Sequence, residues 1–218
     1  MRREIDLSEI SDGKTYQSGD LVKADCHGCV GCHACCCNMG NSIVLDPMDV
    51  DRLTEAVGKD AETLLAETME LHVVDGLILP NLKMSGKENS CVFLNEEGRC
   101  SVHAFRPGIC RMFPLGRYYE DRSFQYFLQV HECPRKKTKI KVEKWLGIAD
   151  IKRYEAYITD WHYFLKDLDE ALNDYGDEER RQMSLYVLRQ FYLTPYPKGM
   201  FYETFDKRLE KAKQMFLE

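Results

Sequence analysis

Signals for membranes, export and nucleic acid are all missing from this sequence of 218 residues. No apolar run approaches the ~20 residues that cross a bilayer, and the start, MRREIDLSEISDGK, lacks the apolar core of a secretory signal. Acidic residues outnumber basic ones, 36 to 30, which gives a formal net charge of −6. Nucleic-acid binding generally requires a basic field. We therefore expect a cytoplasmic protein that contacts neither a membrane nor nucleic acid.

Cysteine is missing from residues 134–218, although the chain holds ten cysteines. This uneven distribution predicts two parts, a cysteine-bearing metal-binding domain over 1–138 and a helical extension over 139–218 that packs on it. The basic stretch PRKKTKIKVEK (134–144) lies at the junction, and we interpret it as a solvated connector. With 44% apolar and 30% charged residues, the chain has the composition of a folded protein.

Six of the ten thiols stand in one run of twelve residues, CHGCVGCHACCC (26–37). A structural core does not need this density, because buried cysteine behaves there as a small apolar residue. Disulfides are disfavoured because cytoplasmic thiols are kept reduced. In addition, the consecutive Cys35, Cys36 and Cys37 are poorly placed to bridge one another. The run therefore predicts thiolate ligands for a metal ion or an iron–sulfur cluster.

The spacing of the run fits either kind of centre. Three overlapping C-x-x-C pairs follow from Cys26, Cys29, Cys32 and Cys35. Successive i+3 cysteines occur in bacterial ferredoxins, where a remote cysteine completes the cluster, and zinc sites also use C-x-x-C. Ten thiols suffice for two four-sulfur sites, or for one cluster and one zinc. Four histidines stand within three residues of a cysteine and could replace a thiol or hydrogen-bond to sulfur: His27, His33, His103 and His131.

The remaining pattern predicts an α+β fold, with an irregular, metal-stapled domain of short hairpins and helices and an α-helical C-terminal extension. We expect a helix starting at Pro47 with Asp46 as its cap, and a second helix over 60–71. Residues 73–84 look extended with a turn at Gly76, and hairpins are expected over 90–103 and 116–130. Apolar residues at helical spacing predict three helices over 148–172, 178–193 and 201–218.

Three stretches resemble a known family. They are CVGCHACC (29–36), CVFLNEEGRCSVHAFRPGICRMFPL (91–115) and HECP (131–134). This order is similar to that of the CxxCxxCC cysteine-cluster family of zinc- or iron-chelating proteins, which includes flagellin lysine N-methylases. The resemblance implies eight ligand candidates: Cys29, Cys32, Cys35, Cys36, Cys91, Cys100, Cys110 and Cys133. Cys26 and Cys37 flank the pattern as extra thiols, and we keep both as candidate ligands.

Two arginines flank Cys110 in the second stretch, Arg106 and Arg111. They could neutralise clustered thiolates, because buried charge is costly unless compensated. Alternatively, either guanidinium could hold the carboxylate of a substrate or cofactor through its planar fork. We therefore include both as candidate cofactor-binding residues.

These observations leave three functions open. The first is a protein that binds an iron–sulfur cluster, for which the spacing of the cysteines favours the [4Fe-4S] type. Such a protein would act in redox chemistry or in cluster-dependent transfer of a group to a small-molecule or protein substrate. The second is a structural zinc module whose helical extension binds a protein partner, and the lack of an evident acid–base pair favours it. The third, implied by the resemblance, is an S-adenosylmethionine-dependent protein lysine N-methyltransferase. No glycine-rich S-adenosylmethionine loop is evident in the sequence.

Overall fold

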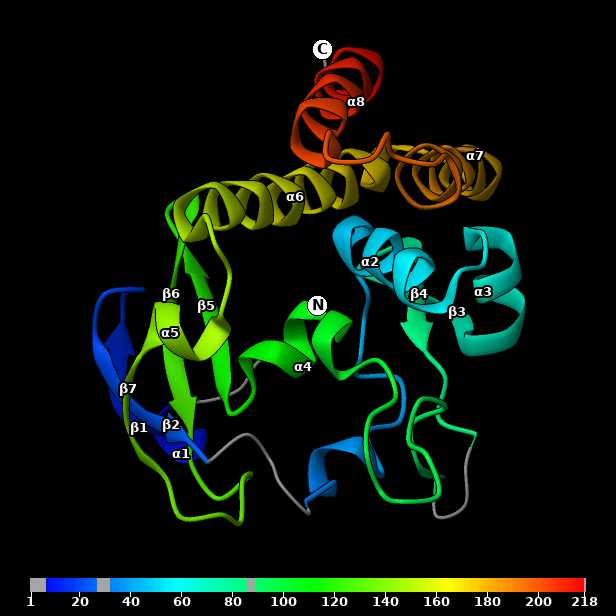
Figure 1. The fold of residues 1–218 in the computed structure, drawn as a ribbon. Coiled ribbons are helices and arrows are strands. Elements are labelled where there is room, and N and C mark those ends of the chain that lie inside the picture. The colour runs from blue at the N-terminus through cyan, green and yellow to red at the C-terminus, as the bar shows by residue number, and fades with distance from the viewer. Residues whose placement is uncertain (1–6, 27–31, 86–88, 218) are drawn as a thin grey trace.

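The chain has an α+β fold of helices and small antiparallel sheets. Strands β3 (Met69–Val74) and β4 (Leu77–Leu82) lie beside helices α2 (Pro47–Val57) and α3 (Ala61–Thr68) at the right of Figure 1, and α5 (Val142–Leu146) lies among the strands at the left. The computed structural model describes residues 7–26, 32–85 and 89–217. Helices α6 (Ile151–Ala171), α7 (Asp177–Val187) and α8 (Phe201–Phe216) lie at the top of Figure 1. Strands β1 (Ser11–Tyr16), β5 (Leu115–Glu120) and β6 (Ser123–Gln129) lie at the left, and the loops that carry cysteine lie at the bottom. The predicted fold class is confirmed.

Helix α2 (Pro47–Val57) forms where its local signals place it. The Asp46 side chain accepts a hydrogen bond from the Asp49 backbone N–H at 2.9 Å, and the Asp49 side chain accepts one from the Asp46 N–H at 3.1 Å. This reciprocal capping satisfies two N–H groups that a helix start leaves without partners. Gly58, at φ 71°, ends the helix in the left-handed conformation.

The second helix is shorter than predicted. Helix α3 (Ala61–Thr68) ends because Met69–Val74 forms strand β3, which pairs in antiparallel register with β4 (Leu77–Leu82). The alternating side chains of Met69–Val74 suit a pleated strand, and tertiary pairing overrides the helical pattern there. The turn between the two strands falls on Asp75 and Gly76, as expected from the glycine.

A three-stranded sheet in the order β1-β6-β5 contains the predicted second hairpin. Strands β5 (Leu115–Glu120) and β6 (Ser123–Gln129) pair directly, and the tight turn places Asp121 and Arg122 at positive φ. Helix α1 (Leu7–Ile10) leads into β1 (Ser11–Tyr16), which pairs with the other edge of β6.

Two sequence predictions around the cysteines are wrong in detail. Residues 90–103 turn back on themselves around Asn95–Gly98 but form no pair of strands: the only bridge between the two arms joins Leu94 to Cys100, and the Leu94 N–H donates to the Cys91 carbonyl. The basic stretch 134–144 is not merely a solvated connector. Its residues Thr138–Lys141 form strand β7, paired with β2 (Leu21–Asp25), and helix α5 (Val142–Leu146) buries both of its end residues.

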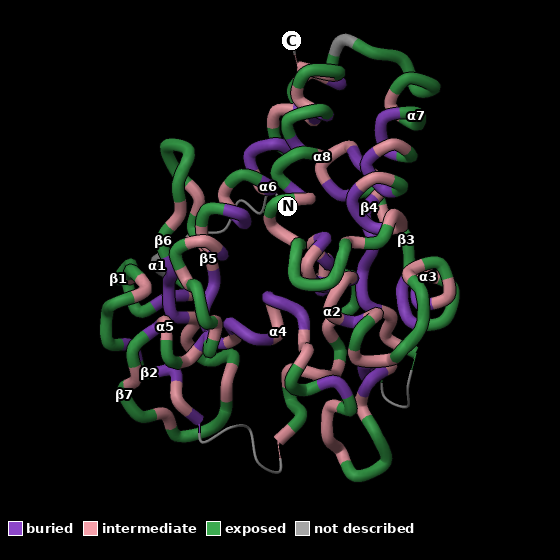
Figure 2. Tube along the Cα trace, turned by 45° about the horizontal axis from the view of Figure 1, so that its top comes forward, coloured by how far each residue is buried: buried purple, intermediate pink, exposed green. Residues whose placement is uncertain are grey.

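The three predicted C-terminal helices are present. They are α6 (Ile151–Ala171), α7 (Asp177–Val187), which continues into a π-helical turn (Leu188–Leu193), and α8 (Phe201–Phe216). A single 3-10 turn, Leu172–Asp174, follows α6. Figure 2 shows buried and exposed turns alternating along α7 and α8, as in amphipathic helices. Aromatic rings of Tyr157, Trp161, Phe191 and Phe205 fill the space between these helices.

One large core crosses the chain position at which we predicted a domain boundary. It joins α2 and the β3–β4 hairpin, through Leu53 and Leu79, with Phe164 of α6 and Phe205 of α8. A smaller core beside it packs β2, β5, β6 and α5 together. The division at residue 138 therefore stays a prediction, although the extension does pack on the cysteine-bearing part.

Candidate metal centre

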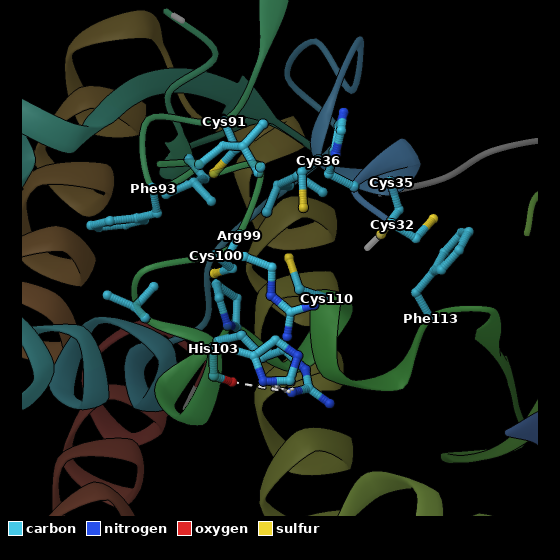
Figure 3. Close-up of a pocket in the computed structure, with 18 of the residues that line it drawn as sticks. Cys32, Cys35, Cys36, Cys91, Phe93, Arg99, Cys100, His103, Cys110 and Phe113 are labelled. Atoms are coloured by element: carbon cyan, nitrogen blue, oxygen red, sulfur yellow. Dashed lines mark hydrogen bonds between the residues drawn. The ribbon is translucent and has the colours of Figure 1, made fainter. Parts of the chain in front are cut away.

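A cavity opens among the loops that carry the cysteines (Figure 3). Its volume is about 870 Å³ when the solvent-filled mouth is included. Cysteine residues from three separated chain segments line it: Cys32, Cys35, Cys36, Cys91, Cys100 and Cys110. The structure therefore brings together six of the ten candidate ligands in one place.

Backbone hydrogen bonds hold the first two of these segments side by side. The 3-10 turn η2 (Ala34–Cys36) presents Cys35 and Cys36. The N–H of Cys91 donates to the Cys36 carbonyl at 2.7 Å, and an isolated antiparallel bridge joins Cys37 to Ser90. Main-chain hydrogen bonds therefore bring together thiols that lie far apart in the sequence, and a metal bound by these thiols would do the same.

The third segment is the short helix α4 (Gly108–Met112), which carries Cys110 and follows the 3-10 turn η4 (His103–Phe105). The backbone N–H of Gly108 donates to the Asp49 carboxylate at 2.7 Å, so α4 is tied to the start of α2. Arg111, on the same helix, donates to the Ala104 carbonyl at 2.7 Å. These contacts fix the helix that presents the Cys110 thiol to the cavity.

Four of the sulfur atoms face a common space. Figure 3 shows Cys36, Cys91, Cys100 and Cys110 around it, whereas Cys32 lies toward Phe113 at the far side. In the parts of the chain that the structure describes, no three Cys, His, Asp or Glu side chains stand close enough to hold one metal ion. None of the nine cysteines in the described ranges forms a disulfide.

Burial and neighbouring thiols raise the pKa of several cavity cysteines and so favour their protonated form. Burial raises the pKa of Cys91 to about 11, and the neighbouring thiols add to the effect. Burial also raises the pKa of Cys110 well above its usual value and that of Cys100 to a lesser degree. A hydrogen bond with Cys36, followed by burial, raises the pKa of Cys35. A metal would have to displace these protons, because only the thiolate is a ligand.

The two predicted cofactor-binding arginines occupy different positions. Arg106 lines the cavity together with Arg99 and His103, and its guanidinium donates to the His103 carbonyl at 3.1 Å. Arg111 does not line it and is buried against backbone carbonyls. Burial, followed by the charges of nearby arginines, lowers the pKa of Arg111 to about 10. Cofactor binding by Arg106 and Arg111 stays a prediction.

A second, smaller cavity of about 350 Å³ lies beyond Phe113. Its lining contains the thiols of Cys26, Cys32, Cys35 and Cys133, so two of these residues reach both cavities. Cys37 lines neither cavity. Cys29 and His27 lie outside the described residues. His33 and His103 line the first cavity, and His131 lines neither.

Several residues of the site were not predicted from the sequence. Arg99, Phe93 and Trp145 line the first cavity, and Asp49 holds the helix that carries Cys110. Arg99 directly precedes Cys100, which is a usable signal for a cation beside a thiolate. Trp145 and Asp49 are far from the cysteines along the chain, and no local pattern points to them.

A cavity surrounded by so many thiols defines a cysteine-rich metal-binding protein. Residues 28–141, just over half of the chain, match the family model named CxxCxxCC, described as a "putative zinc- or iron-chelating domain". The chain therefore belongs to the CxxCxxCC family, and the resemblance seen in the sequence is confirmed. No curated protein and no solved structure matches the chain. None of the helices in the described ranges has both the length and the apolar character needed to cross a membrane.

Proposed function

We propose that the first cavity holds an iron–sulfur cluster of the [4Fe-4S] type, ligated by Cys36, Cys91, Cys100 and Cys110. The observation that carries this proposal is the arrangement of these four sulfurs around one space in Figure 3. Four thiolates are the ligand set of a cubane cluster. The cavity is also much larger than the one beyond Phe113, which suits a multi-atom group.

The charged and polar residues that line the cavity support a role for the cluster beyond stabilising the fold. Arg99, Arg106 and His103 add cationic and hydrogen-bonding groups to the lining. A bound cluster would supply an electron or a Lewis-acidic iron at this place. The two arginines would attract a small anionic substrate and compensate the negative charge of the thiolates. We therefore infer a redox or cluster-dependent transfer function for the family member described here.

The test is anaerobic reconstitution with iron and sulfide. We expect uptake of about four irons per chain, a brown colour and a paramagnetic signal on reduction. Cys91→Ser and Cys110→Ser should each abolish most of this uptake, whereas Cys37→Ser is the matched control because Cys37 lines neither cavity. A wild-type protein that rejects iron and sulfide but binds zinc in the same cavity would contradict the proposal.

The second candidate is a zinc-folded interaction module. The observation that favours it is that the described cysteine loops contain little regular structure beyond η2, η4 and isolated bridges, so a metal would supply much of their order. A protein partner would then bind the helical extension, where Leu185, Met200 and Met215 expose apolar surface. A colourless protein with stoichiometric zinc, whose partner binding is lost in Leu185→Asp, would support this function over the first.

Lysine methylation, which the resemblance implies, is the third candidate. S-adenosylmethionine binding and methyl transfer to a lysine peptide are its direct tests. We also propose a cytoplasmic location, because cysteines that form no disulfide among the described residues suit a reducing compartment.

A further inference from the structure

Three arginine side chains meet at the 3-10 turn η4, which borders the first cavity. Arg52 and Arg111 both donate to the Ala104 carbonyl, at 3.1 and 2.7 Å, so their guanidinium groups share one oxygen atom. Arg106 donates to the neighbouring His103 carbonyl at 3.1 Å. The three arginines belong to α2, to α4 and to the loop between η4 and α4. Tertiary packing therefore gathers three cations around one turn.

The positive charges of this arginine cluster are not balanced locally. In the part of the chain that the structure describes, no carboxylate forms an ion pair with Arg52, Arg106 or Arg111. Burial, followed by the charges of Arg52 and Arg106, lowers the pKa of Arg111 to about 10, as expected for crowded cations. Such crowding costs free energy unless an opposite charge is near, and it is unusual in a chain of formal net charge −6. An anionic ligand would remove the repulsion.

The turn is open to a ligand. His103 and Ala104 are exposed, Arg106 is half-buried, and His103 and Arg106 line the cavity. A guanidinium carries five N–H donors. Only one guanidinium nitrogen of Arg52 and one of Arg106 donates to a residue that the structure describes. Both side chains therefore keep donors for a further acceptor.

We propose that Arg52, Arg106 and Arg111 bind the carboxylate or phosphate group of a small organic substrate at η4, beside the first cavity. The proposal rests on the proposed function, since this anion would be the substrate of the cluster. A planar guanidinium pairs with two oxygens of a carboxylate or phosphate, whereas a lysine acts only as a point charge.

The three arginines would have different parts in binding. Arg52 and Arg106 would contact the anion, and the buried Arg111 would add its charge. Arg52 and Arg111 do not line the cavity, so a negatively charged cluster there is not their direct partner. Leu94 and Val102 line the cavity and suit the carbon skeleton of the substrate.

Titration of the metal-loaded protein with two anions tests the site. Citrate carries only carboxylates and pyrophosphate only phosphates, so the comparison also identifies the preferred group. We expect one anion per chain, with a Kd below about 1 mM. Arg52→Gln and Arg106→Gln should each weaken binding at least about tenfold, because each removes charge-assisted hydrogen bonds. Arg189→Gln, an exposed change in the π-helical turn, is the matched control and should bind as wild type does. Wild-type protein that binds neither anion, or equal binding by all variants, would overturn the proposal.

Arginine labelling of wild-type protein covers the case in which a variant does not fold. Phenylglyoxal, which modifies guanidinium groups, should react more slowly with Arg52 and Arg106 when the preferred anion is saturating, and at an unchanged rate with Arg189. Equal rates at Arg52 and Arg106 with and without the anion would overturn the proposal.

The iron content of the same samples separates this proposal from the proposed cluster. Protein that holds about four irons but binds neither anion refutes the anion site and leaves the cluster standing. Protein that holds only zinc but binds one anion per chain, with the loss in Arg52→Gln, supports the anion site and refutes the cluster.

Discussion

The carboxylate of Asp49 accepts a hydrogen bond from the backbone N–H of Gly108, with 2.7 Å between nitrogen and Oδ1. The other carboxylate oxygen accepts from the N–H of Asp46. One buried side chain therefore caps α2 and anchors the start of α4, two residues before Cys110. The geometry of a candidate ligand depends in this way on a residue that never reaches the cavity.

Replacing Asp49 with alanine should destabilise the protein and loosen α4. The change leaves two backbone N–H groups without their acceptor, and a buried unpaired group costs about 1–3 kcal/mol. Urea unfolding should show this loss, and metal analysis should show weaker binding at Cys110. Glu55→Gln, an exposed change on the same helix, should alter neither quantity. Equal stability of Asp49→Ala and wild type would contradict the role of the hydrogen bond.

The same carboxyl should make stability depend on pH. Burial, followed by the charge of Asp46, raises the pKa of Asp49 to about 8 in the folded state, while hydrogen bonds from the Asp46 and Gly108 N–H groups and the Arg117 charge oppose the shift. The unfolded value is about 3.9, so the folded state binds the extra proton. The stabilisation of the folded state that comes from this proton is therefore complete below about pH 4 and is lost as pH rises toward 8.

Comparison with Asp49→Asn isolates this contribution. The variant cannot titrate at this position, so its stability relative to wild type should improve between pH 6 and pH 8, by up to about 1.4 kcal/mol per pH unit. Urea unfolding of metal-loaded protein at each pH measures the difference, and metal-linked effects common to both proteins cancel. Parallel pH profiles for the two proteins would show that the raised pKa is absent.

Gly108→Ala should be costly, because there is no room for a methyl group. An added Cβ would stand 2.6 Å from the Tyr154 hydroxyl oxygen, which accepts a hydrogen bond from Arg117 at 2.8 Å. We expect a loss of about 1–3 kcal/mol. Gly19→Ala is the matched control, since nothing lies within 4 Å of its Cβ position. Adding Tyr154→Phe to Gly108→Ala should cost less than the sum of the single changes, and strict additivity would argue against the clash.

Metal removal should unfold the cysteine loops before the elements that share the large core. Chelation under reducing conditions should lower the thermal transition of these loops, since ligation supplies much of the order of irregular loops. Hydrogen exchange should accelerate at the Cys91 amide, which is bonded to the Cys36 carbonyl, and change little in α6, whose Tyr157 and Phe164 are fully buried. An unchanged melting curve after verified metal loss would contradict this prediction.

Local signals allowed much of the fold to be predicted. Helix α2 follows from Asp46, Pro47 and Asp49, because its capping bonds join residues three apart in the sequence. The β5–β6 hairpin and the three C-terminal helices follow from periodicity in the same way. The pairing of β2 with β7 could not be predicted, since each strand is short and its partner lies more than a hundred residues away. Residues 90–103 turn back on themselves with one bridge, between Leu94 and Cys100, and Cys91 also bonds to the Cys36 carbonyl, a contact that no local pattern predicts.

The cysteine pattern indicated the chemistry of the site but not its division. Spacing makes every C-x-x-C pair equivalent, whereas in the structure Cys36 lines only the first cavity, Cys26 and Cys133 line only the second, and Cys32 and Cys35 line both. The role of Asp49 could likewise be predicted only in part. Its position in the sequence explains a helix start, but its bond to Gly108 depends on tertiary packing.

The strand pair β2–β7 has a consequence for how the protein is made. Cys26 leaves the ribosome early, but its cavity partner Cys133 and strand β7 are synthesised about a hundred residues later. Chain synthesis proceeds at about 5–20 residues per second, so the N-terminal thiols wait for several seconds as unpartnered nucleophiles. During that interval the growing chain depends on the reducing power of its surroundings, and β2 can pair only after β7 has been made.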